Sequence, residues 1–276
     1  MKVLTLARIA TDSIRKNTMR TLLTMLGIVI GVAAVIVMVA IGQGATTRIE
    51  EQVKSLGTNM LVITAGASTA GGVSQGAGTY NRLTIVDADK LQREATLVAA
   101  VSPVIFTRSQ VIGGEGNWRT SINGVDANYS VIRDWTTIYG SFFTEDDVRA
   151  IRKVALLGST VAEGLFPGGD PVGQQVQIRN VPFTVVGVLA PKGQTAGGDD
   201  QDDVVLVPYT TAQTRLSGHS FIGQIIASAI DPSQITAAQE ELRQIMHESH
   251  DLGNGADDFT VRNQTELANA ATETTA

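Results

Sequence analysis

The most prominent pattern in the chain is an uninterrupted apolar run near its start. Residues 22–41 carry no charged side chain, and the nearest charges on either side are Arg20 and Arg48. A helix over this run spans roughly 30 Å, which matches the hydrocarbon core of a bilayer. A buried helix of a soluble protein is usually shorter and keeps a polar face, which this run lacks. The pattern therefore predicts a transmembrane helix, placed at residues 21–45.

The charges around the run predict its orientation. The basic residues that precede it are Lys2, Arg8, Arg15, Lys16 and Arg20, against a single Asp12, whereas the signs are balanced after it. Positive residues stay in the cytoplasm, so the N-terminus is expected inside and the rest of the chain outside. Arg15, Lys16 and Arg20 then form a cytoplasmic anchor, and residues 1–20 an amphipathic segment at the membrane surface. A cleaved signal peptide is the alternative.

Small residues within the run predict a packing face. Gly27, Gly31 and Ala34 lie on one side of a helix, where a second helix can approach closely. The alternative is that glycine is simply common in membrane helices. Gly42 and Gly44 follow at the outer end and are the predicted hinge, because glycine in a helix interior costs about 1 kcal/mol relative to alanine.

Beyond the run, the chain alternates between helical and strand patterns. The helix is expected to continue over residues 46–56, and strands and helices then follow one another to residue 265. This order predicts an α+β domain. Residues 46–123 and 201–265 are assigned to two flanking halves, and residues 124–200, rich in short strands and hairpins, to an inserted subdomain.

Local signals place several element ends. Capping boxes are predicted at Thr84 with Asp87 and at Thr160 with Glu163, and Thr144 is a further helix cap. Asp231-Pro232 opens an amphipathic helix with Ile235, Ala238, Leu242, Ile245 and Met246 on one face. A hairpin is expected to turn at Asn180, and the small residues of 66–79 are expected to form a loop.

Composition excludes several classes of function. The 276 residues carry a net charge of −6 with no basic tract beyond the N-terminus, which argues against a nucleic-acid partner. The absence of cysteine removes thiolate catalysis and disulfides. The sequence contains neither a phosphate-binding G-x-x-x-x-G-K-[ST] loop nor a G-x-S-x-G elbow. No enzymatic activity and no cofactor are therefore expected of this chain.

Two polar clusters could in principle hold a metal. His247 and His250 lie near a helix end, but His219 is the only other histidine, so solvated helix-end residues are the preferred interpretation. Asp199, Asp200, Asp202 and Asp203 lack the spacing of a calcium-binding EF-hand, and their glycine neighbours favour a flexible solvated loop.

Several motifs in order resemble one known family. The segments "NTMRTLLTMLGIVIGVAAVIVMVAIGQGA", "SLGTNMLVITAG", "LTIVDADKL", "VAAVSP", "FFTEDDV", "KVALLGSTVAEGLF", "DPVGQQVQI" and "PFTVVGVLAPKG" are similar to the MacB-like, FtsX-type permease subunits of ABC transporters. The resemblance covers nearly the whole chain.

The resemblance implies a periplasmic domain with a porter-like part, built from the two flanking halves, and a second subdomain at 124–200. It also implies four membrane helices, so that residues 266–276 would lead to a missing second helix and the chain would be the N-terminal portion of a permease. The implied partners are an ABC ATPase subunit, a second permease copy, a periplasmic adaptor protein and the lipid bilayer. The implied role is to transmit ATP-driven motion to the periplasmic domain of an inner-membrane exporter.

Two other classes of function stay open at this point. One is a single-pass membrane-anchored protein whose outer domain binds a partner or acts as a scaffold. The other is an extracytoplasmic enzyme, which the lack of a catalytic constellation disfavours.

Overall fold

A computed structural model describes residues 17–55, 59–70, 73–77, 82–114, 116–195, 198–218, 221–253, 255–264 and 266, with the backbone alone for 42–55 and 67–77. The chain forms two compact units, residues 1–51 and residues 52–276. The predicted class, an α+β fold preceded by one apolar helix, is confirmed.

The first unit contains most of the helix α2 (Thr18–Ser55), which runs without interruption for 38 residues and ends within the first residues of the second unit. Its continuation past the apolar run, expected from the sequence, is confirmed. The hydroxyls of Thr21 and Thr24 donate to backbone carbonyls one turn earlier, at 3.0–3.1 Å. Even the polar side chains of the apolar stretch therefore satisfy their hydrogen bonds within the helix, as an environment without water requires.

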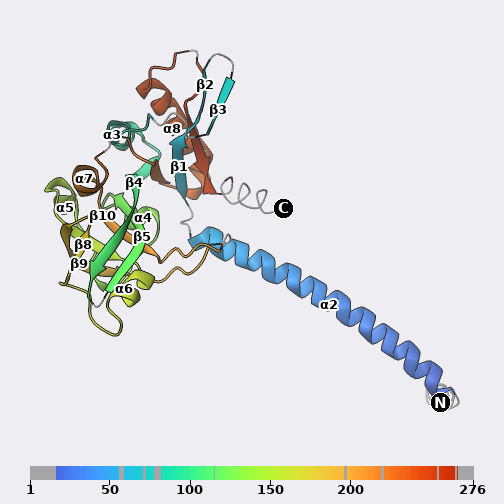
Figure 1. Ribbon diagram of the computed structural model, residues 1–276. Coiled ribbons are helices and arrows are strands. Elements are labelled where there is room, and N and C mark those ends of the chain that lie inside the picture. The colour runs from blue at the N-terminus through green and yellow to red at the C-terminus, as the bar shows by residue number, and fades with distance from the viewer. Residues whose placement is uncertain are drawn as a thin grey trace. The chain divides into compact units, whose positions relative to one another are not determined.

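The second unit is a domain of strands and short helices (Figure 1). Its strands are β1 (Met60–Ala65), β2 (Ala67–Ala70), β3 (Val73–Ala77), β4 (Val98–Gly113), β5 (Gly116–Val125), β6 (Thr137–Gly140), β7 (Val154–Leu157), β8 (Gln175–Ile178), β9 (Val181–Leu189), β10 (Val204–Pro208), β11 (Gln224–Ala229) and β12 (Phe259–Asn263). Its helices are α3 (Ile85–Glu94), α4 (Tyr129–Ile132), α5 (Glu145–Arg149), α6 (Ser159–Leu165), α7 (Tyr209–Thr211), the π-helix η1 (Ala212–Ser217), the 3₁₀ turn η2 (Pro232–Gln234) and α8 (Ile235–Ser249).

One part of the domain is an antiparallel layer in the order β12-β1-β11-β4. The central strand β1 pairs with β11 on one side and with β12 on the other. Leu61 and Ile63 of β1 are fully buried in the same core cluster as Leu91 of α3 and Leu242 of α8. The apolar faces of both helices therefore cover one face of this layer.

The other part of the domain is a closed barrel of six strands. Starting from β4, each strand pairs with the next in the order β5, β10, β7, β9 and β8, and β8 pairs back onto β4. Closure leaves no free edge within the ring. Val111, Ile122, Phe183 and Val205 are fully buried in its core, so side chains fill the barrel.

The long strand β4 belongs to both parts. It pairs with β11 as far as Val104 and with β5 from Ile105 onwards. It is a single strand of 16 residues. The strands β5 and β10 pair with each other in the barrel, and β10 also pairs with β7 of the 124–200 region. The division of the chain at residues 124 and 200 stays a prediction, because the sheet is continuous across it.

Most local signals are confirmed. Thr84 and Thr144 each form a capping box, with Asp87 and Asp147 respectively. Arg179 and Asn180 both have positive φ, as the two-residue turn between β8 and β9 requires. Pro232 begins the turn that leads into α8.

Two local predictions are wrong. The expected loop at 66–79 contains the paired strands β2 and β3, since backbone pairing is possible even for small side chains. The expected capping box of Thr160 and Glu163 is absent, because α6 begins at Ser159, with Gly158 and not Thr160 as its cap. The Thr160 hydroxyl instead donates to Asp200 Oδ2 at 2.7 Å.

Candidate functional site

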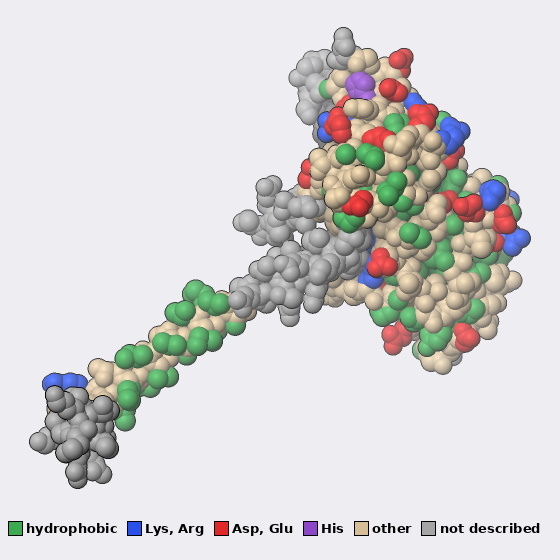
Figure 2. Space-filling view, turned by 180° about the vertical axis from the view of Figure 1, so that it is seen from behind, with side chains coloured by type: hydrophobic (Ala, Val, Ile, Leu, Met, Phe, Trp, Pro, Cys, Tyr) green, Lys and Arg blue, Asp and Glu red, His purple; other side chains and the backbone are tan. Residues whose placement is uncertain are grey.

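The apolar stretch of α2 carries its hydrophobic side chains on all sides. Within the described residues, Thr18–Ile41 is the one helical segment long and apolar enough to cross a membrane, with a mean hydropathy of 2.9. Leu26, the least exposed of its large hydrophobic side chains, is still 51% exposed. Figure 2 shows hydrophobic side chains along the apolar stretch of α2, with a basic residue at its N-terminal end. Length and composition both fit a bilayer span.

The predicted packing residues lie on this stretch with open space around them. A side-chain atom added at Gly27 or Gly31 would meet nothing within 4 Å, and Ala34 is exposed. Positions i, i+4 and i+7 share one helix face, so the three residues are brought together as expected. Their role in helix packing stays a prediction.

The other predicted residues of this region have different outcomes. Arg20 is exposed in the first turn of α2, whereas Arg15 and Lys16 lie outside the described residues. Gly42 and Gly44 lie within α2, which is not interrupted there. Their role as a hinge stays a prediction.

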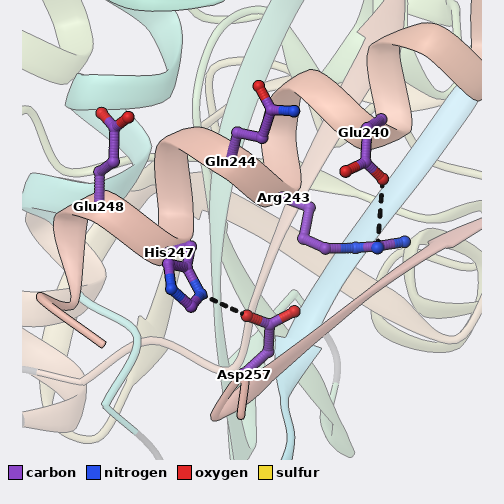
Figure 3. Close-up of a pocket in the computed structure, with 6 residues that line it drawn as sticks. All are labelled: Glu240, Arg243, Gln244, His247, Glu248 and Asp257. Carbon is purple, nitrogen blue, oxygen red and sulfur yellow. Dashed lines mark hydrogen bonds and ion pairs between the residues drawn. The ribbon is translucent and has the colours of Figure 1, made fainter. Parts of the chain in front are cut away.

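A shallow pocket on the domain lies along the last turns of α8 (Figure 3). His247 is its central residue: Nδ1 lies 2.7 Å from Asp257 Oδ1, and Nε2 lies 2.8 Å from the carbonyl of Gly253. Hydrogen bonds to Asp257 and Gly253 raise the pKa of His247. Both ring nitrogens therefore face oxygen atoms of the following loop, which leaves neither for a metal.

His250 is buried rather than solvated, which corrects the prediction for this residue. Its side chain is 6% exposed, with Nδ1 2.6 Å from Asp258 Oδ1 and Nε2 3.4 Å from Asp87 Oδ2. Asp87 also accepts from Ser249 and from its cap partner Thr84. This polar cluster ties the start of α3, the end of α8 and the start of β12 together.

The acidic loop is also more ordered than the sequence suggests. Asp202 is buried and accepts from the backbone of Lys192 and Gly193, at 2.8 and 2.9 Å. Asp203 accepts from the Trp118 indole at 2.8 Å. The carboxylates fix the turn and a neighbouring strand, and are not arranged for calcium.

A lysine packs beside this loop. Lys192 Nζ donates to the carbonyl of Arg133 at 2.7 Å and lies 5.5 Å from the centre of the Trp135 ring. Burial, followed by the nearby positive charge of Arg133, lowers the pKa of Lys192 to about 8. The sequence gives no signal for the contact between Lys192 and Trp135, because the two residues are far apart in the chain.

The described residues contain no group of three or more histidine, aspartate and glutamate side chains that could hold a metal. The polar clusters of the domain are therefore interpreted as structural contacts. The features that set this chain apart are the exposed apolar helix and the composite α+β domain joined to it in sequence.

Comparison with known proteins identifies this combination. A family model described as the MacB-like periplasmic core domain matches residues 21–245. The chain belongs to the MacB-like periplasmic core domain family, and the resemblance predicted from its motifs is confirmed.

Full-length relatives carry the same region as part of a longer chain. The chain is 42% identical over 262 residues to a macrolide export ATP-binding/permease protein MacB from Rhodospirillum rubrum, covering 94% of this chain and 39% of the relative. It is 38% identical over 267 residues to the protein of that name from an Azoarcus species, covering 97% and 39%. It therefore spans about two-fifths of the length of these relatives.

Solved structures share the fold. The periplasmic region of MacB from Actinobacillus actinomycetemcomitans matches with a TM-score of 0.67 and 24% identity, covering 83% of this chain and 100% of that one. The extracellular domain of a noncanonic ABC-type transporter, YknZ, from Gram-positive bacteria matches with a TM-score of 0.59 and 19% identity, covering 74% and 100%. At these identities the similarity applies to the fold alone.

Proposed function

We propose that this chain is the N-terminal portion of the permease subunit of an ABC-type exporter, and that it transmits ATP-driven motion to a periplasmic domain. The observation that carries the proposal is the direct sequence connection of a long helix to a central strand. The helix α2 ends at Ser55 and β1 begins at Met60, so four residues separate them.

The chain offers a physical basis for such transmission. A helix of 38 residues extends roughly 57 Å at about 1.5 Å per residue, so its backbone can link one side of a bilayer to the other. The strand β1 that follows is hydrogen-bonded on both sides and has fully buried side chains. A displacement of β1 therefore has to move its neighbouring strands, because it cannot slide without breaking both ladders.

The proposed setting is the inner membrane, with the N-terminus in the cytoplasm and the domain in the periplasm. An ABC ATPase supplies the energy, and a second permease copy completes a dimer. The face of Gly27, Gly31 and Ala34 packs against the further membrane helices of the permease. A periplasmic adaptor and the bilayer complete the proposed partners. The names of the relatives combine ATP-binding and permease functions, which supports an ATPase domain or subunit for this chain as well.

The coupling role is tested by a break in the helix. In the full-length permease with its ATPase, Gln43→Pro removes a helical hydrogen bond at a cost of about 3 kcal/mol or more. We expect membrane insertion and dimerisation to persist while ATP-dependent export falls sharply. The matched variant Gln43→Ala keeps the helix and should export normally. Normal export by a correctly inserted Gln43→Pro protein would instead indicate a membrane-anchored binding or scaffold protein.

The orientation is tested by labelling single cysteines. The chain has no cysteine of its own, so each introduced thiol is unique. Cysteine at the exposed Thr236 of α8 should react in intact spheroplasts with a reagent that cannot cross membranes. Cysteine at Ser13, outside the described residues, should react only after lysis. The opposite pattern would reverse the proposed topology.

A further inference from the structure

Two arginines lie on one outer face of the β4–β5 ribbon of the barrel. In the strand register, Arg108 stands opposite Ser121, and Arg119 stands opposite Gln110. Directly paired residues point to the same side of a sheet, and so do residues two apart along one strand. All four side chains therefore share this face.

Arg108 leans from β4 towards the neighbouring strand β5. Its Nε lies 3.4 Å from the hydroxyl of Ser121, which is two residues from Arg119 on β5. Both arginines also border the same open hollow of about 420 Å³, together with Ser109 and Gln110.

Neither arginine has a carboxylate partner among the described residues within 4.0 Å. In contrast, Arg149, Arg152 and Arg243 each form such an ion pair. Two guanidinium groups without such a partner among the described residues are unexpected in a chain with a net charge of −6. Guanidinium groups bind carboxylate and phosphate through paired hydrogen bonds, so two of them facing one hollow favour an oxyanion.

An aromatic ring lies on the same face of β4 as Arg108. Phe106 lies two residues before Arg108 on β4 and is 53% exposed. A side-chain atom added at Gly223 would lie 2.4 Å from Phe106 Cδ2, so the ring packs directly over the glycine backbone. The missing side chain at Gly223 therefore leaves the space that the ring of Phe106 occupies, on the same face as the arginines.

We propose that this surface binds an organic oxyanion. Arg108 and Arg119 hold the phosphate or carboxylate group, and Phe106 contacts the apolar group attached to it. The proposal concerns binding alone and assigns no reaction to this surface. It goes beyond the proposed coupling role and does not depend on it, because binding requires neither ATP nor movement.

The test measures binding by the full chain in nanodiscs of zwitterionic lipid. Calorimetric titrations use phenyl phosphate, benzoate, inorganic phosphate and benzylamine. We expect phenyl phosphate or benzoate to bind, and the ratio of their affinities to identify the preferred oxyanion. Benzylamine carries the ring with the opposite charge and should not bind. Failure of both oxyanions to bind would overturn the proposal.

Variants assign the binding to this surface. The double variant Arg108→Gln/Arg119→Gln should bind the preferred probe about tenfold more weakly or worse, because each arginine supplies charge-assisted hydrogen bonds. Phe106→Ala should weaken phenyl phosphate binding while leaving inorganic phosphate unchanged.

The control is Arg93→Gln, which removes an exposed arginine from α3 without affecting the hollow. Its affinity should equal that of the unmodified chain. An equal loss in Arg93→Gln and in the double variant would show general charge attraction and refute the site. Unchanged unfolding midpoints, followed by tryptophan fluorescence, would exclude misfolding as the cause of any loss.

Discussion

The apolar helix and the domain place the same residue types in opposite surroundings. The large hydrophobic side chains of the apolar stretch of α2 are 51–76% exposed, whereas Leu61 and Ile63 of β1 are fully buried. Burial of such a side chain contributes about 1.5–3 kcal/mol, so the domain is stabilised by its own packing. Within the described residues, α2 gains nothing comparable. Its hydrophobic surface needs lipid or other helices to cover it.

The two regions also differ in how their sequence specifies structure. In β9, buried positions such as Phe183 and Val185 alternate with Pro182 and Thr184, which are exposed, so a slip of one residue would expose the core face. The apolar stretch of α2 has no such alternation. Only its small residues distinguish one helix face from another, and these are the residues proposed to set its packing.

The largest expected effect sharpens this contrast in the barrel. Phe183 is fully buried, and Phe183→Ala removes its ring from a close-packed interior. We expect the domain to lose about 3–5 kcal/mol of unfolding free energy, from lost burial and a remaining cavity. Denaturant unfolding followed by tryptophan fluorescence measures this directly, because both tryptophans, Trp118 and Trp135, belong to the domain.

The matched change on the helix is Val35→Ala. Val35 is 62% exposed, and its methyl groups contribute nothing to the core of the domain. The fluorescence-detected unfolding curve should coincide with that of the unmodified chain. A destabilisation similar to that of Phe183→Ala would mean that helix and domain are not energetically separate, and the comparison would fail.

Local features of the fold were predictable from the sequence. The apolar run identified α2, because its length and missing charges are visible in one segment. The cap at Thr84 and the turn at Asn180 depend on residues within a few positions of each other. The family resemblance rested on motif order, which is also a property of the linear chain.

Features that depend on distant pairing were not predictable. The barrel closes only because β8 pairs with β4, more than 60 residues earlier in the chain. The sequence favours a solvated His250, because one of its two partners, Asp87, lies 163 residues away in the chain. The register of β4 and β5 places Arg108 and Arg119 on one face, and this register is not visible in either segment alone. Periodicity shows which side of a strand is buried but not which strand lies beside it.

An intermediate effect is expected from the polar cluster that joins α3, α8 and β12. Burial raises the pKa of Asp87, but hydrogen bonds from Ser249 and Thr84 outweigh it and hold the pKa below its usual value. In Asp87→Asn, one of the two accepting oxygens becomes a donor that faces another donor. We expect a loss of about 1–3 kcal/mol in unfolding free energy.

The pH dependence of this effect has a defined sign. The lowered pKa means that Asp87 contributes stability above its unfolded pKa of about 3.9, and that this contribution is lost as the pH falls. The unmodified chain and Asp87→Asn should therefore converge in stability under acid conditions. A constant difference between their unfolding free energies down to strongly acidic pH would contradict this assignment.

The smallest expected effect is a pH-dependent change in unfolding midpoint at His247. Residues 22–41 of α2, which contain no titrating group, should show no such change. In His247 the protonated ring donates from both nitrogens, to Asp257 and to the Gly253 carbonyl, and these hydrogen bonds raise its pKa. A raised folded pKa gives a contribution that is complete below the unfolded pKa of about 6.5 and disappears as the pH rises through the folded value. The unfolding midpoint of His247→Gln should therefore lie furthest below that of the unmodified chain at mildly acidic pH, and the gap should narrow at alkaline pH.

Asp257→Asn should show the same narrowing of the gap in unfolding midpoint, because it removes the largest cause of the raised pKa of His247. Val35→Ala, which changes no titrating group, should follow the unmodified chain at every pH. A gap that stays constant from pH 5 to pH 9, values chosen to be about two units either side of the ordinary histidine pKa, would show that His247 holds the loop without being protonated.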